Sequence, residues 1–88
     1  MCDMNKDYIP SWKDVIEVLA IRGWELSKFE KKKKEFRRRN EILIVFKKPD
    51  GHWNVEYFVR PRKLDDSTGP FNDEKTARIW ATEMGFLR

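Results

Sequence analysis

Two adjacent apolar runs joined by a turn sequence constrain the fold of this chain more than any other feature. Residues 42–46 (ILIVF) are all aliphatic or aromatic, which is typical of a buried central strand. Residues 48–51 favour a tight turn, because Pro49 fixes its own φ and Gly51 tolerates a positive φ. Residues 53–59 then alternate, with Trp, Val, Tyr and Val on one face. We therefore predict an antiparallel hairpin over these residues.

The segments before the hairpin predict a helix and a first strand. Ser11, followed three residues later by Asp14, is a capping-box sequence, and the apolar spacing after it favours a helix over residues 11–22. Residues 24–28 alternate apolar and polar side chains and indicate the start of a strand. The basic stretch at 28–40 (KFEKKKKEFRRRN) allows two interpretations. We favour two strand ends joined by a basic turn, and a solvent-exposed helix is the alternative.

The segments after the hairpin predict a loop and a second helix. We interpret residues 62–70, which include the run DDSTG, as a loop. Asn72 is the expected N-cap of the helix, and Gly85 its expected end. The predicted fold class is α+β, in the order α-β-β-β-α, with a three-stranded antiparallel sheet and two helices packed on one face of it. A chain of 88 residues holds one core, which we place at residues 11–88 after a flexible N-terminal tail at 1–10.

The charge of the chain is concentrated in its middle. Residues 28–63 contain 13 basic and 5 acidic residues (+8), whereas the rest of the chain contains 6 basic and 10 acidic residues (−4). A dense basic segment is typical of a protein that neutralises phosphates, and a solvated, solubilising face is the alternative. The residues predicted to bind nucleic acid are Lys28, Lys31, Lys32, Lys33, Lys34, Arg37, Arg38, Arg39, Lys47, Lys48, Arg60, Arg62 and Lys63.

The aromatic residues divide into predicted core residues and candidates for base stacking. All four Trp residues fall on inferred apolar faces, so we expect them in the core. Stacking on nucleic-acid bases requires exposed aromatic rings. The candidates for that role are Phe29, Phe36, Tyr57 and Phe58, of which the first two lie inside the basic segment.

The strand at residues 42–46 is apolar on both faces. With both helices on one face of the sheet, we expect the other face to expose Leu43, Val45 and Phe58. An exposed apolar patch marks a partner surface, so a second copy of the chain or a target protein would cover it. Helices on both faces, or coverage by the N-terminal tail, would remove the need for a partner.

The composition excludes several classes of site. One His and one Cys cannot form an ordinary zinc site or a disulfide framework, and the four glycines form no phosphate-binding loop. No run reaches the roughly 18 apolar residues of a membrane span, and the first residues do not form a secretory signal. We therefore expect an intracellular, cytoplasmic protein that is not an enzyme, with no cofactor, no metal and no membrane association.

The order of elements resembles the double-stranded-RNA-binding fold, which is shared by small HicA-type toxins. Lys75-Thr76-Ala77-Arg78 is similar to the pattern at the second helix of such RNA-binding domains, where basic residues meet phosphates. The resemblance implies phosphate contacts for Lys75 and Arg78, although acidic residues precede Lys75 where that family has lysines. The catalytic His of the toxins is absent, since Arg38-Arg39-Asn40 stands at about that position, so the resemblance implies binding without ribonuclease activity. Gly51-x-Trp53 with residues 71–81 also resembles the arm-binding domains of phage integrases.

Two hypotheses follow. The first is a small, non-enzymatic nucleic-acid-binding protein that grips the phosphate backbone of DNA or RNA through the central basic segment, with weak sequence specificity. The alternative is a protein-interaction module, such as a small regulator or inhibitor encoded by a phage or mobile element, which uses an apolar sheet face.

Overall fold

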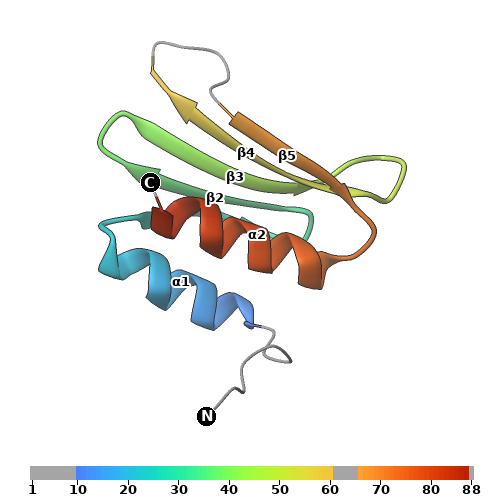
Figure 1. Cartoon of the computed structure of the whole chain (residues 1–88), viewed down its shortest axis with the longest axis horizontal. Helices are drawn as coiled ribbons and strands as arrows, with labels where there is room; N and C mark the ends of the chain where they lie inside the picture. The colour runs from blue at the N-terminus through green and yellow to red at the C-terminus, as the bar shows by residue number, and fades with distance from the viewer. Residues whose placement is uncertain (1–9, 61–65, 88) are drawn as a thin grey trace.

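The computed structural model describes residues 10–60 and 66–87, and it has two layers, an antiparallel sheet and a pair of helices (Figure 1). In chain order the described elements are α1 (Trp12–Ile21), β1 (Glu25–Glu30), β2 (Lys33–Arg38), β3 (Glu41–Lys47), β4 (Trp53–Val59), β5 (Asp66–Phe71) and α2 (Glu74–Leu87). The helices run in the same direction, because their N-terminal ends meet at Trp12 and Glu74 and their C-terminal ends at Arg22 and Phe86. The predicted tail at 1–10 lies outside the described residues, except for Pro10.

The described part of the sheet has five strands, so the predicted three-stranded sheet is wrong. The strand order is β1-β2-β3-β4-β5, and every neighbouring pair is antiparallel. The two additional strands are β2, which lies in the basic stretch, and β5, which overlaps the predicted loop at 62–70. Pattern analysis misses β2 because two of its three core-facing positions are Lys34 and Arg38, and only Phe36 between them is apolar. The broader α+β class is confirmed.

The predicted helix start and hairpin turn are both confirmed. The Ser11 hydroxyl accepts a hydrogen bond from the Asp14 amide at 3.2 Å, and the Asp14 carboxylate accepts one from the Ser11 amide at 3.2 Å. This reciprocal pair caps α1. In the turn, Gly51 has φ 93°, and the Asp50 carboxylate accepts a hydrogen bond from the His52 amide at 3.0 Å.

The boundaries of α2 differ from the prediction at both ends. Asp73, rather than Asn72, accepts a hydrogen bond from the Thr76 amide, at 2.9 Å. Gly85 lies inside the helix, which continues to Leu87. A Cβ atom added to Gly85 would lie 2.5 Å from Cδ2 of Leu19, so this glycine allows close contact between the helices instead of ending one.

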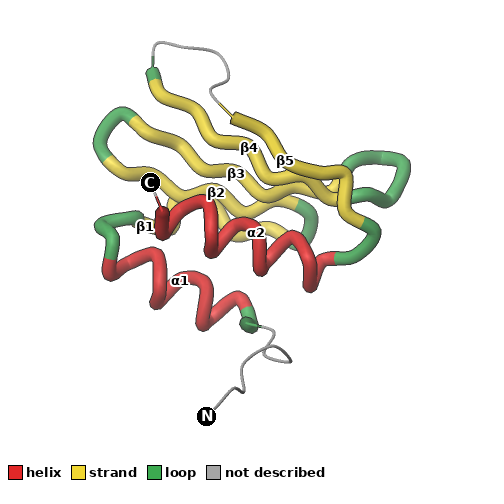
Figure 2. Tube along the Cα trace, viewed as in Figure 1, coloured by secondary structure: helices red, strands yellow, loops and turns green. Residues whose placement is uncertain are grey.

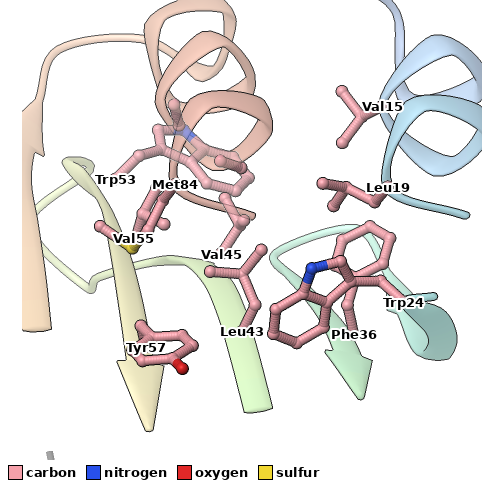
Figure 3. Packing of buried hydrophobic residues seen from close by; sticks show 12 residues of the cluster. Val15, Leu19, Trp24, Phe36, Leu43, Val45, Trp53, Val55, Tyr57 and Met84 are labelled. Atoms are coloured by element: carbon pink, nitrogen blue, oxygen red, sulfur yellow. The ribbon is translucent and has the colours of Figure 1, made fainter. Parts of the chain in front are cut away.

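The core fills the space between the helices and the sheet (Figure 3). It consists of Val15, Leu19, Trp24, Phe36, Leu43, Val45, Trp53, Val55, Tyr57, Ala77, Ala81 and Met84. Only two of the four Trp residues are members, which corrects the expectation for all four. Trp12 is partly buried, and Trp80 is exposed and stacks on Phe71, with ring centroids 6.0 Å apart.

The strand register corrects the predicted partner face. Leu43 and Val45 are 0% exposed and lie in the core opposite Tyr57 and Val55. Phe58 is paired with Ile42, and directly paired residues lie on the same face of a sheet. Phe58 therefore shares the face opposite the helices with alternate residues of β3, not with Leu43 and Val45.

Candidate nucleic-acid interface

Both helices lie on the same side of the sheet (Figure 2), and none of the described elements covers its other side. We call this second side the open face. Its centre is an apolar strip, which we define as Ile42, Ile44, Phe46 and Phe58. These four side chains are neither fully buried nor fully exposed. The strip lies on β3 and β4, two of the three interior strands of the described sheet.

Lysines gather at one end of the open face, where the β1–β2 and β3–β4 turns lie side by side. The Lys47 amide donates to the Lys32 carbonyl at 2.8 Å, which ties the two turns together. We define the lysine end as Lys31, Lys32, Lys33, Lys47 and Lys48. Of these, Lys47 is paired with Trp53, so it lies on the helix side of β3, at the rim of this end. A hollow of about 420 Å³ joins this end to the apolar strip. It is lined by Lys32, Lys33, Ile44, Phe46, Lys47 and Glu56.

Arginines gather at the opposite end, around the β2–β3 turn. The Arg60 amide donates to the Asn40 carbonyl at 2.9 Å, so the end of β4 is held against this turn. We define the arginine end as the exposed residues Arg37, Arg39 and Arg60. Two of them line a hollow of about 750 Å³, together with Arg22, Gly23, Glu25, Arg38 and Glu41. The seven residues of β3 separate the two ends by about 20 Å.

Acidic residues balance part of the positive charge on the outer strands. Three basic residues of β1 and β2 lie directly opposite a carboxylate on the neighbouring strand. The pairs are Glu25 with Arg37, Lys28 with Glu35, and Glu30 with Lys33. The Arg37 side chain also forms an ion pair with Glu35 at 3.1 Å. The positive field is therefore strongest at the turns rather than along the strands.

Lys34, a predicted phosphate ligand, is only 3% exposed and points into the core. Its ammonium donates to the Lys31 carbonyl at 2.9 Å and lies 3.6 Å from the Glu74 carboxylate. It also lies near three aromatic rings, with centroid distances of 4.9 Å to Trp12, 5.2 Å to Phe29 and 5.7 Å to Trp53. With these partners and this burial, Lys34 cannot contact a phosphate from solvent.

Arg38 and Arg78 are also bound within the molecule. Arg38 pairs with Glu41, donates to the Arg22 carbonyl at 3.0 Å and lies 4.4 Å from the ring centroid of Trp24. Its hydrogen bond lowers the pKa of Glu41 below the ordinary value. Arg78 donates to the Pro10 carbonyl and lies 3.8 Å from Glu74. Both guanidinium groups therefore hold the fold together.

The remaining predicted binding residues lie in three different places. Lys28 is exposed on β1, where its pairing with Glu35 places it on the open face, and Lys75 is exposed on the helical layer. Arg62 and Lys63 lie outside the described residues. Of the stacking candidates, Phe36 and Tyr57 are core residues, and Phe29 is 54% exposed beside Trp12.

Sequence reasoning missed three members of the apolar strip, Ile42, Ile44 and Phe46, although the sequence contains a signal for them. The hairpin pairs Lys47 with Trp53, so counting back from the turn pairs residue 42 with residue 58. Because Trp53, Val55 and Tyr57 form the core-facing set, the even-numbered residues of β3 must face outward with Phe58. Of the predicted partner-face residues, only Phe58 belongs to the strip.

Comparison with known proteins gives no relative from which a function could be transferred. No family model, curated protein or solved structure matches the chain. Within residues 10–60 and 66–87, no group of three or more His, Cys, Asp or Glu side chains is placed to hold a metal ion. Neither described helix is long and apolar enough to cross a membrane. The surfaces described above are thus what remains to indicate a function.

Proposed function

We propose that the chain is a non-enzymatic nucleic-acid-binding protein that contacts phosphates through the lysine end and the arginine end of its open sheet face. The observation that supports this proposal is the placement of cationic groups at both ends of one uncovered face, about 20 Å apart. A polyanion lying along β3 would contact both groups at once. One end alone would give only a local patch.

The predicted energetics are those of counterion release. Each phosphate that is neutralised releases condensed cations, so the affinity falls steeply with salt. If about five phosphates are contacted, the slope of log affinity against log salt is about −4.5 for duplex DNA and about −3.5 for a single strand. The contacts are to the backbone, so sequence preference should be weak.

The test is a binding titration with fluorescent DNA and RNA oligonucleotides, between about 50 and 200 mM salt. One variant, Lys31→Gln with Lys32→Gln, removes charge from the lysine end, and another, Arg39→Gln with Arg60→Gln, removes it from the arginine end. The matched control is Lys13→Gln with Lys75→Gln, which removes the same charge from the exposed surface of the helices. We expect each sheet-end variant to bind more weakly and to reduce the slope by about one to two, and the control to change little.

Two results would overturn this proposal. The first is no association with any strand or duplex at low salt. The second is an equal loss of affinity in the control variant, because this would show that only the net charge matters. Because the control variant includes Lys75→Gln, it also tests the phosphate contact that the resemblance to double-stranded-RNA-binding domains implies for Lys75.

A protein-interaction module is a second candidate function, and one observation favours it. Two adjoining hollows between the outer surfaces of the two helices are lined mainly by apolar side chains, together with Thr82 and Glu83, and Ile21 and Leu87 are 77% and 78% exposed. A second copy of the chain is the partner to test, since a two-fold contact would bury these residues in both copies. Light scattering should then show a dimer that Ile21→Ser with Leu87→Ser converts to a monomer. A monomeric parent protein would exclude this assembly.

A further inference from the structure

We infer that the open face binds single-stranded rather than duplex nucleic acid, with unpaired bases on the apolar strip and phosphates at the two basic ends. This inference rests on the proposed function and names its substrate class. Support for a single strand comes from the side chains that lie between the lysine end and the arginine end, namely the apolar strip and the glutamates beside it.

The two rings of the strip are too far apart for neighbouring bases of a stacked helix. Phe58 is paired with Ile42, and Phe46 lies four residues further along β3, so the rings are separated by about 13 Å along the strand direction. Stacked bases in one strand of a duplex are only about 3.4 Å apart. Bases that lie on both rings must therefore be splayed out of a stack, as they are when proteins bind single strands.

The centre of the face is unsuitable for phosphates. Ile44 is flanked on the neighbouring strands by Glu35 and Glu56, and neither of these two carboxylates is fully exposed. A phosphate placed over Ile44 would be repelled by the Glu56 carboxylate and would lose its hydration against apolar atoms, whereas the charge of Glu35 is balanced by its ion pair with Arg37. The outer surface of a duplex presents phosphates to such a flat face, and its base rings are hidden by stacking.

The same centre is suitable for bases. A base ring can stack on Phe46 or Phe58, and aliphatic side chains between them provide further apolar contact. The partly exposed Glu56 carboxylate can accept hydrogen bonds from exocyclic amino groups, such as N4 of cytosine. Cations at both ends with apolar and acidic groups between them therefore match a short single strand with its bases toward the sheet. At about 20 Å, the face spans about four nucleotides, the lower limit for sheet-based single-strand sites.

The experiment compares one labelled oligonucleotide of about 12 nucleotides, as a single strand and as a blunt duplex, in competition at fixed salt. The variants are Phe46→Ser with Phe58→Ser, and Phe46→Leu with Phe58→Leu, which keeps apolar bulk if the serine pair impairs folding. Phe29→Ser, at an exposed ring on the helix side, is the matched control. Circular dichroism and thermal unfolding check that each variant is folded.

We expect the parent protein to prefer the single strand by at least tenfold. Each ring removed should weaken single-strand binding by about tenfold, while duplex binding, its salt slope and the control remain unchanged. Equal affinity of the parent for both forms, or no effect of either double variant, would overturn the inference and leave the proposed function in place. A parent dimer that the serine pair dissociates would also overturn it, because a second copy would then cover the face. No binding to either form would instead remove the proposed function.

Discussion

Lys34 carries an ammonium group into the part of the core where both helices begin. Its charge is stabilised by the Glu74 carboxylate, a carbonyl and three ring faces, which together offset the cost of burial. Breaking a buried pair costs more than replacing it by an apolar group of similar shape. We therefore expect Lys34→Met to change the free energy of unfolding by less than about 1 kcal/mol, and Glu74→Gln to lower it by about 1–3 kcal/mol, since Glu74 is partly exposed.

Urea unfolding followed by tryptophan fluorescence measures both changes. Lys32→Met, in the exposed β1–β2 turn, is the control for adding a methionine. If Lys34→Met destabilised the fold more than Glu74→Gln, the ammonium itself would be the stabilising group. Glu74 would then not be the group that compensates the burial of the Lys34 ammonium.

Glu41 should make the fold sensitive to acid. Hydrogen bonds from the Arg38 guanidinium and the Tyr57 hydroxyl lower its pKa below the ordinary 4.5. A carboxyl with a lowered pKa in the folded state stabilises the fold above its unfolded pKa, and this contribution is lost as the pH falls through the folded pKa. We expect the free energy of unfolding to decrease below about pH 4.5, and to decrease less in Glu41→Gln.

The measurement is urea unfolding from neutral pH to about pH 3. Glu17→Gln, at an exposed position on α1, is the matched control for the change in net charge. An identical pH dependence in Glu41→Gln and the parent would show that other carboxyls account for the acid sensitivity.

At the scale of elements, the sequence predicted the fold correctly wherever the regularly spaced apolar residues are also the residues that the structure buries. The β3–β4 hairpin and α1 follow directly from such patterns. The pattern fails at β2, because Lys34 and Arg38 face the helices and reach partners that only the tertiary structure provides. It fails for the open face because the register, and not the hydrophobicity of β3, decides which of its two apolar sides is covered. The two basic ends form because turns that are distant in the sequence lie side by side in the fold. A local sequence pattern does not predict which turns will be neighbours.

The contact between the helices predicts an unusual effect of a glycine substitution. Alanine in place of glycine normally stabilises a helix interior by about 1 kcal/mol. At Gly85, however, the added methyl would lie 2.5 Å from Leu19 and 3.1 Å from Leu43. We expect Gly85→Ala to destabilise the fold by about 1–3 kcal/mol, because α2 would have to move away from α1.

Thermal and urea unfolding measure this effect, with Glu83→Ala on the exposed side of α2 as the control for helix propensity. Adding Leu19→Val should recover part of the loss, since it shortens the side chain that is contacted. A stabilising Gly85→Ala, or no coupling with Leu19, would show that the helices can separate at no cost.

At the scale of the whole molecule, the arrangement of charge matters more than its total. The net charge of +4 is modest, and several cations of the basic segment are held by carboxylates or by the core. The exposed cations that remain are concentrated at the turns, at opposite ends of one face. The tertiary structure thus converts a basic stretch of sequence into two separate basic ends, and it leaves the acidic Glu56 between them.

This arrangement gives Glu56 a specific role in discrimination. Its carboxylate at the centre of the open face should repel a duplex phosphate more than a base. At a separation of about 7 Å in water, one unit charge contributes about 0.6 kcal/mol, or about threefold in affinity. We therefore expect Glu56→Gln to raise duplex affinity by about threefold and to change single-strand affinity less. Glu83→Gln, on the helical layer, makes the same change in net charge and should raise both affinities equally and only slightly. If the two variants had the same effect, the centre of the face would play no part in choosing between duplex and single strand.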